Sequence, residues 1–298
     1  MIFPQLSNLL HEVHETYRSF TSGSPISRVK TLQDILVKKH YWPYLQVKYF
    51  GNNSPLVLLH NVYRQEVPID NKELYDECRS VVLNMDANEG ENIILSLSKK
   101  IPIRHTVDSF LNANVSDIER IELGYEGTML YMYHYQDRWH ISTSTCPSVD
   151  RSRYFHPTKS HGDMLNEALL HYFPNEVTQE GENARQFHQR LREKFFGYLD
   201  VSKTYRFLLV HHENGYLMNY SPIFGEHYKK LFQMGTIDQN QNDSMDPDSS
   251  LIALGIVPPI EFVNIGDAFE YLQSNDPCYS IMFHTPSNLY KVCRPDIY

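Results

Sequence analysis

The chain has 298 residues, enough to bury a substantial core, and its apolar fraction of 41% and charged fraction of 21% exclude a disordered chain. The formal net charge of -9 counts against nucleic-acid binding through bulk charge, because such a surface repels phosphate backbones. The 21 tyrosines and 15 phenylalanines, against 13 glycines, predict much β structure, since aromatic rings suit half-buried sheet faces.

The N-terminal part of the sequence predicts two helices followed by a hairpin. Apolar residues recur at helical spacing over 6–20, and a second short helix is predicted over 32–39. Strand-like residues follow at 45–50 and 55–63, separated by the turn-forming residues 51–53. We therefore expect helices and one hairpin in the first 70 residues.

Beyond residue 70 most of the predicted elements are strands. They are expected at 79–85, 92–98, 118–123, 128–135, 138–144, 204–212, 216–221, 279–285 and 289–293. The three strands between 118 and 144 are expected to form a compact meander, with turns near Glu126-Gly127 and Gln136-Asp137.

Helical patterns interrupt these strands at about 162–199 and at 265–274. The stretch 237–250 is polar and acidic, which predicts an exposed loop within a domain. Strands, then helices, then strands again, without regular βαβ alternation, predict an α+β fold with antiparallel sheets.

The cysteines and the N-terminus indicate the compartment. Cys78, Cys146, Cys278 and Cys293 lie far apart, with no CxxC pair, which predicts reduced thiols in an intracellular protein. The N-terminus lacks the features of a signal peptide, and no apolar run is long enough to span a bilayer. We expect a cytoplasmic protein without a membrane partner.

A series of segments carries motif-like residues in a fixed order. These are ECRSVVLNMD (77–86), ILSLSKKIPIRH (94–105), GYEGTMLYMYHYQDRWHISTST (124–145), YRFLLVHHENGYLMNY (205–220) and PCYSIMFHTPSNLYKVCRPDIY (277–298). Taken together they resemble the phage-type RNA ligases, the first RNA ligase family of T-even bacteriophages. The resemblance covers most of the chain from Asp76 onward.

The resemblance implies a nucleotidyltransferase domain in which two antiparallel sheets form a cleft flanked by helices. One such domain would span 1–298, with helices and a hairpin in 1–70, a ligase-like core in 71–298 and a loop excursion near 237–250. The strand after Arg79 and the turn at Glu126-Gly127 would then line one cleft.

The catalytic positions of the family are not retained. The ligases attack ATP with a lysine held in line with the departing pyrophosphate, and the matching position here is Gly124, which has no side chain to attack with. The glutamates of motifs III and IV fall at Leu208 and Pro277, and the second motif V lysine falls at Cys293. Magnesium and triphosphate would lose most of their ligands.

Some nucleotide-binding positions are retained. Arg79 matches the arginine of the family's ECRG strand, Lys291 matches the first motif V lysine, and Tyr125 adjoins the vacant lysine position. Glu126 keeps the acidic half of the KxDG motif, although Glu126-Gly127 is also an ordinary turn sequence. Arg79 could bind phosphate or could form an ion pair with Glu77 or Glu126.

Three further groups of residues carry chemistry-bearing side chains. Lys99, Lys100 or Tyr125 could replace the missing nucleophile, but the loss of both carboxylates disfavours this. The histidines suggest a metal site but lack a ligand motif, and adjacent strand residues His211 and His212 would face opposite sides, so no metal site is expected. The histidines considered are His134, His140, His156, His161, His211 and His212. The basic segment 189–196 is expected to be a solvated helix face.

The leading hypothesis is a catalytically inactive RNA-ligase-like protein with a binding or assembly role, for example a viral accessory or virion protein in the host cytoplasm or the virion. Its aromatic strands and acidic loop would contact a protein partner, and no cofactor is expected. The alternatives are an active ligase that uses ATP and magnesium through another nucleophile, and a sensor of nucleotides or RNA ends that binds through Arg79 and Lys291.

Overall fold

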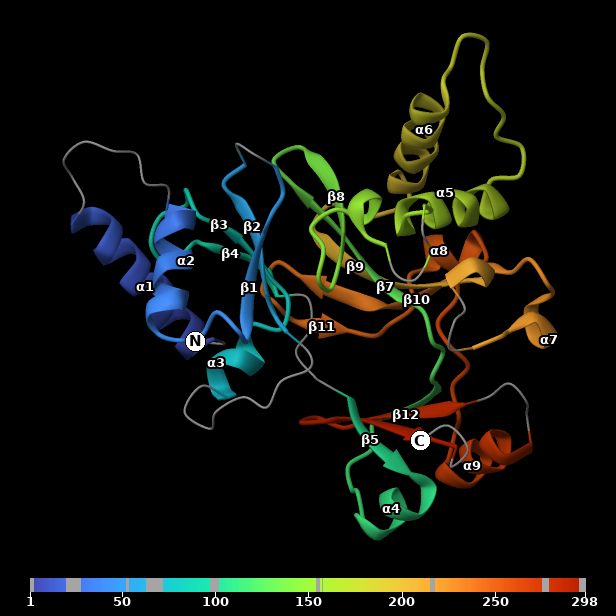
Figure 1. The fold of residues 1–298 in the computed structure, drawn as a ribbon. Helices are drawn as coiled ribbons and strands as arrows, with labels where there is room; N and C mark the ends of the chain where they lie inside the picture. Colours follow the sequence, from blue (N-terminus) through green and yellow to red (C-terminus); the bar gives the residue numbers. More distant parts are fainter. Residues whose placement is uncertain are drawn as a thin grey trace. The chain divides into compact units, whose positions relative to one another are not determined.

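The chain divides into two compact units (Figure 1). The computed structural model describes residues 3–19, 28–51, 54–62, 72–96, 102–153, 156, 158–214, 218–274 and 279–294. Unit 1 comprises Met1–Lys99 and Ser142–Ser148, and unit 2 comprises Lys100–Ile141 and Val149–Tyr298. The single domain over 1–298, with its parts 1–70 and 71–298, stays a prediction.

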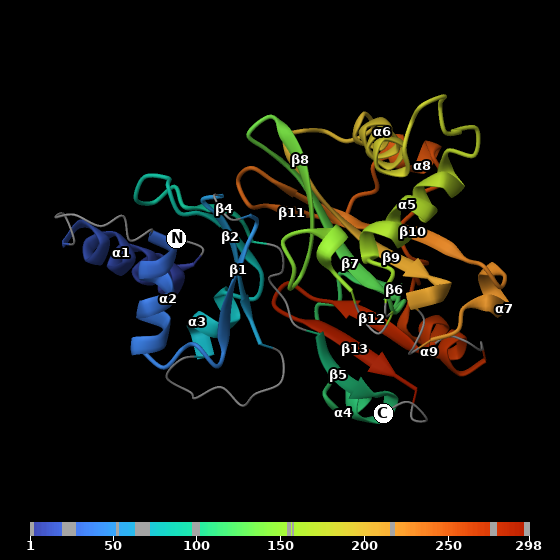
Figure 2. The ribbon, with the colours of Figure 1, turned by 45° about the horizontal axis from the view of Figure 1, so that its top comes forward.

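Unit 1 is an antiparallel four-stranded sheet covered on one face by helices (Figure 2). The strand order is β1-β2-β3-β4, formed by β1 (Leu45–Tyr49), β2 (Leu56–Asn61), β3 (Val81–Asn84) and β4 (Ile93–Ser96). The helices are α1 (Pro4–Ser19), α2 (Arg28–Lys38) and α3 (Lys72–Glu77). Leu6 and Leu32 pack in one core with Val57, because helical and strand periodicities each place apolar residues on one face.

The first sheet of unit 2 has five strands in the order β11-β10-β9-β7-β8. They are β7 (Thr128–Tyr135), β8 (Arg138–Thr143), β9 (Lys203–His211), β10 (Lys229–Asp238) and β11 (Asp243–Ser244). Helices α5 (His161–Tyr172), α6 (Ala184–Phe196) and α8 (Ser249–Ala253) cover one face, where Leu169 and Phe195 pack against Phe207. Capping boxes at Ser160 and Asn183 begin α5 and α6.

The second sheet of unit 2 has the order β5-β13-β12-β6. Its strands are β5 (Pro102–Thr106), β6 (Arg120–Leu123), β12 (Ser280–His284) and β13 (Leu289–Cys293). Phe110 of α4 (Val107–Asn112) and Phe269 of α9 (Ile265–Ser274) pack against Phe283, so these helices cover the apolar face. This leaves the opposite face of the sheet for polar residues.

The α+β class is confirmed, but the sheet arrangement differs from the expectation of two antiparallel sheets. The described residues form three sheets, and β5 pairs with β13 in parallel. The expected meander over 118–144 is wrong: β7 and β8 are neighbours joined by a tight turn with positive φ at Gln136 and Asp137, whereas β6 pairs with β12 in another sheet. Residues 124–127 carry the chain from one sheet to the other.

Two further elements differ from the predicted secondary structure. Strand β10 was not predicted, because it opens with two lysines and contains Gly235 at a bulge. The expected strand at 216–221 is absent from its described residues 218–221, and Ser221 instead begins the short helix α7 (Ser221–Phe224) with a proline in its first turn.

The acidic stretch 237–250 is structured rather than an open loop. It contains the end of β10, strand β11 and the start of α8, and the Asp238 carboxylate accepts backbone N–H groups from Asn240 and Asn242, both at 2.8 Å. Asp248 caps α8, since its side chain accepts the N–H of Ser250 at 2.9 Å. Its acidic residues therefore have local structural roles.

In the parts of the chain that the structure describes, no helix combines the length and apolar character needed to cross a bilayer.

Candidate functional site

The polar face of the second sheet in unit 2 carries several of the motif positions. Strand register aligns Arg104, Lys291, Met282 and Glu122 in one row across the four strands. The next row, of which Phe283 is a member, points to the apolar side, since neighbouring strand residues alternate between faces. Lys291 on β13 and Gly124, which directly follows β6, therefore belong to the same sheet.

The backbone of Gly124 forms two hydrogen bonds with Ser280 of β12. Its N–H donates to the carbonyl of Ser280 at 2.9 Å, and the Ser280 hydroxyl donates to the Gly124 carbonyl at 2.9 Å. A Cβ atom at Gly124 would lie 3.1 Å from the Ser280 carbonyl oxygen and 3.2 Å from Met282 Cγ, and closer still to the Ser280 hydroxyl. The position that matches the ligase lysine is therefore a site of close strand approach.

This close approach leads to a prediction for Gly124→Ala. The added methyl group must displace the Ser280 hydroxyl, so we expect a loss of about 1–3 kcal/mol in the free energy of unfolding. Gly51→Ala is the matched control, because no heavy atom lies within 4 Å of its Cβ position, and it should change stability by less than about 0.5 kcal/mol. Urea denaturation measures both, and equal stabilities would contradict the close approach.

Tyr125 lies in an aromatic cluster rather than in an open site. Its ring stacks on Phe232 at 4.3 Å between centroids and meets the edge of Tyr220 at 5.5 Å. The Tyr220 hydroxyl accepts the Glu126 N–H at 2.7 Å, and burial raises the pKa of Tyr220 well above its usual value. Tyr125 is 9% exposed, so its ring is part of the core.

Glu126 and Lys291 form an ion pair with each other. Lys291 comes from β13 and Glu126 from the segment after β6, and the side chains are 14% and 28% exposed. Two of the expected nucleotide-binding residues are thus brought together, but each satisfies the charge of the other. A phosphate could bind Lys291 only in competition with this carboxylate.

Two other substituted positions, Leu208 and Cys293, are also packed. Leu208 is buried with Tyr125 and Phe232 in one core cluster. Cys293 is buried at the end of β13, and burial raises the pKa of its thiol. A Cβ atom at Gly127 would lie 2.5 Å from the backbone oxygen of Leu209, so Gly127 permits the approach of β7 to β9.

Arg79 belongs to unit 1, where it precedes β3 and is half-buried. Its expected partner Glu77 accepts the backbone N–H groups of Gln5 at 3.2 Å and Leu6 at 2.7 Å, which caps α1. A shared cleft with Glu126-Gly127 stays a prediction, because the two segments lie in different compact units. Lys99, Lys100 and Pro277 lie outside the described residues.

A buried ion-pair group on the polar face was not predicted. The Glu122 carboxylate, 1% exposed, lies 3.0 Å from Arg120 Nε and 3.0 Å from His284 Nε2, and Arg120 also contacts Glu261 at 2.8 Å. The alternation of charged and apolar residues over 120–123 was the available signal. The partners could not be read from it, because His284 lies 162 residues away.

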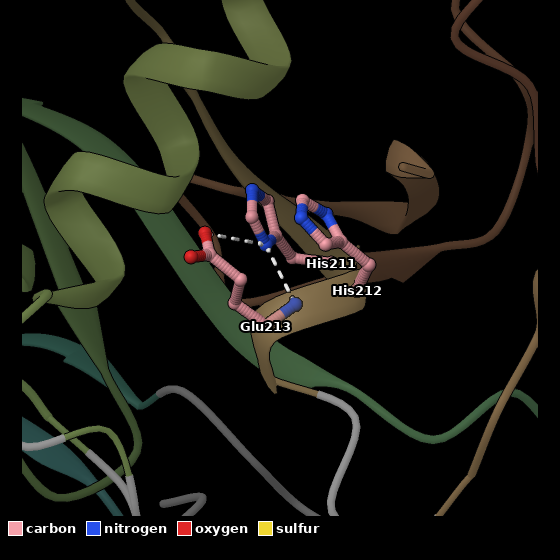
Figure 3. A group of neighbouring side chains, drawn as sticks. All are labelled: His211, His212 and Glu213. Atoms are coloured by element: carbon pink, nitrogen blue, oxygen red, sulfur yellow. Dashed lines mark hydrogen bonds and ion pairs between the residues drawn. The ribbon is translucent and has the colours of Figure 1, made fainter. Parts of the chain in front are cut away.

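The histidine pair differs from the sequence-based expectation. Strand β9 ends at His211 and a short 3-10 turn (His212–Asn214) follows, so strand alternation stops and the two rings stack at 4.6 Å (Figure 3). His211, His212 and Glu213 each offer one ligand atom within 4.8 Å of the others. Burial, opposed by Glu167, lowers the pKa of His211 to about 4. The prediction of opposite faces was wrong.

The other expected candidates have structural partners. His161 is buried, with Nδ1 2.8 Å from the Ser152 hydroxyl. The basic residues of 189–196 pair with carboxylates: Arg190 with Glu182 at 3.0 Å, Arg192 with Asp150 at 2.6 Å and Lys194 with Glu176 at 2.6 Å. Because these cations of α6 are paired with carboxylates, they do not support an RNA-binding site on this helix.

Two solved structures are distantly similar to this chain, and each gives a TM-score below 0.5. The sequence matches no family model and no curated protein. Among solved structures it is similar to a protein assigned as an ATP-dependent DNA ligase from Aquifex aeolicus, with a TM-score of 0.47 and 12% identity, over 88% of this chain and 62% of that chain. An archaeal ATP-dependent RNA ligase gives a TM-score of 0.46 and 9% identity, over 87% and 60%.

The chain therefore spans about three-fifths of the length of these two ligase structures. Likeness at this distance says nothing about activity or substrate. The function must be argued from the side chains at the motif positions.

Proposed function

We propose that this chain is a catalytically inactive ligase-like protein whose scaffold serves binding or assembly. The observation that carries the proposal is the state of Gly124, the position that matches the nucleophilic lysine. The Gly124 N–H donates to the Ser280 carbonyl, and the Gly124 carbonyl accepts the Ser280 hydroxyl. Even a methyl group at this position would crowd the neighbouring strand. Covalent catalysis needs a nucleophile held in line with the leaving group, and this position supplies none.

The surrounding residues support the same proposal. Leu208 replaces a carboxylate with an apolar side chain in the core, and Tyr125 packs on Phe232. Lys291 is the retained cation, but Glu126 neutralises it. A magnesium-triphosphate group requires oxygen ligands and unpaired cations, and here the Glu126 carboxylate and the Lys291 ammonium group are paired with each other.

The alternative is a nucleotide sensor, and it predicts that ATP competes with Glu126 for Lys291. ATP with magnesium is titrated calorimetrically into the full chain, into Glu126→Gln and into Arg79→Ala. We expect no saturable binding in the wild-type chain, because ATP would have to displace Glu126 from Lys291. Binding that appears only in Glu126→Gln would fit a site closed by the ion pair.

Saturable ATP binding by the wild-type chain that is lost in Arg79→Ala would instead favour a nucleotide sensor. Gly124→Lys provides a further control: the side chain has no room beside Ser280, so restoring the lysine should not restore AMP transfer. AMP transfer by that variant would show that the scaffold still holds a working site.

A further inference from the structure

The end of β9 carries a compact group of potential metal ligands, which lies within the ligase-like segment 205–220 but includes none of the matched catalytic positions. His211 closes the strand, and His212 and Glu213 begin the following 3-10 turn, so three consecutive side chains gather beside one another (Figure 3). The Glu213 carboxylate lies 3.8 Å from His211 Nδ1. Two imidazoles and a carboxylate are the donor types that suit zinc-class ions.

The hydrogen bonds of the His211 and His212 rings indicate which ring nitrogen carries the proton and which has the lone pair. His211 Nε2 lies 3.2 Å from Glu167 Oε2, and a carboxylate only accepts, so Nε2 carries the proton. His211 Nδ1 accepts the backbone N–H of Glu213 at 3.2 Å, which places its lone pair on the Glu213 side. A histidine that donates its other N–H to a carboxylate is the usual arrangement of a metal ligand.

His212 offers a second nitrogen. Its Nδ1 lies 3.3 Å from the carbonyl oxygen of Tyr228, so Nδ1 donates and Nε2 holds the lone pair. The His212 ring is half-buried, whereas the His211 side chain is fully buried. Ligand atoms in a zinc site lie about 2.0–2.2 Å from the ion, so closure requires movement of roughly 1 Å by His212 and Glu213.

Lys159 is the charge that opposes a cation here. Its ammonium group contacts Glu213 and also bonds Glu167 at 2.6 Å, while Lys229 bonds Glu167 at 2.9 Å. A bound cation would replace Lys159 at Glu213, and Lys159 would keep Glu167 as its partner. The site is therefore one in which a lysine and a metal ion compete for one carboxylate.

We propose that His211, His212 and Glu213 form a binding site for one zinc-class divalent ion. The inference is independent of the proposed function, because Gly124, Lys291 and the other motif positions take no part in it. His211 provides the buried side of the site, and the half-buried His212 and Glu213 complete it.

The test is calorimetric titration of Zn²⁺ alone into the chelator-treated full chain, with Co²⁺ absorption as a second readout of coordination. We expect one saturable site. His212→Ala should weaken binding at least tenfold, whereas His227→Ala should leave it unchanged, because the exposed His227 ring lies 5.3 Å from His212 but outside the group. Circular dichroism checks that each variant is folded.

Lys159→Met gives the complementary result. Removing the competing ammonium should tighten Zn²⁺ binding by tenfold or more, while an adventitious surface site would not respond. The proposal is overturned if neither the wild-type chain nor Lys159→Met shows saturable binding. It is equally overturned if His212→Ala binds Zn²⁺ as well as His227→Ala does.

Discussion

Replacing Phe283 with alanine is expected to lower the free energy of unfolding of unit 2 by about 3–5 kcal/mol. Phe283 is fully buried on β12, stacks on Phe110 at 4.3 Å and meets the edge of Phe269 at 5.7 Å. The truncation leaves a cavity between the sheet and helices α4 and α9, and the close-packed rings around it can fill that cavity only in part. The loss tests whether these helices cover the sheet that carries Gly124 and Lys291.

The measurement must report unit 2 alone. Of the two tryptophans, Trp42 lies in unit 1 and Trp139 in unit 2, so urea unfolding in a Trp42→Phe background follows unit 2 by fluorescence. Ile103→Ala is the control on the same sheet, because Ile103 is 42% exposed, and it should cost less than about 1 kcal/mol. Similar losses for both variants would contradict the assigned core.

The second large effect is a loss of stability in mild acid through His140. Burial of the ring, with the charge of Arg138, lowers the pKa of His140 to about 4 from its ordinary 6.5, and Arg138 Nε donates to its Nε2 at 3.3 Å. Between pH 6.5 and about 4 the unfolded chain binds a proton that the folded chain does not. Stability therefore falls as the pH falls, and His140 contributes about 2 kcal/mol of this by pH 4, allowing for its partial contact with solvent.

Nuclear magnetic resonance titration of the His140 ring measures the folded pKa, and urea unfolding at several pH values measures the linkage. His140→Gln should flatten the stability profile between pH 6.5 and 4, and Arg138→Gln should raise the folded pKa toward 6.5. An ordinary folded pKa, or an unchanged profile in His140→Gln, would contradict the buried neutral ring.

Local sequence patterns predicted much of the secondary structure. Helix α9 occupies the predicted range 265–274, and β7 occupies the predicted range 128–135, because both have strong periodicity over their full length. Strand β10 escaped prediction because Lys229, Lys230 and Gly235 interrupt its apolar pattern. Sheet partners were not predictable from such patterns, since β6 pairs with β12 and β5 with β13 across long stretches of sequence.

In the candidate site, too, the residue types were visible in the sequence but their long-range contacts were not. The glycine at the lysine position is visible in the sequence, but its contact with Ser280 joins residues 156 positions apart. Arg79, Tyr125, Glu126 and Lys291 are the positions that would bind a nucleotide if the protein took one, and the structure pairs Lys291 with Glu126 across 165 positions. An interaction surface on the aromatic strands stays a prediction, although Tyr205 and Phe207 of β9 are buried. Residue types therefore indicated the motif positions, and only long-range packing revealed what those residues contact.

The central claim is that no side chain of this protein takes up AMP from ATP. The most direct measurement is intact mass spectrometry of the full chain after incubation with ATP and magnesium, under both acidic and alkaline work-up, with an active ATP-dependent RNA ligase in parallel. We predict no AMP adduct on this chain and a clear adduct on the control. A stoichiometric single AMP adduct, mapped by peptide analysis to Lys99, Lys100, Tyr125 or any other residue, would contradict the account.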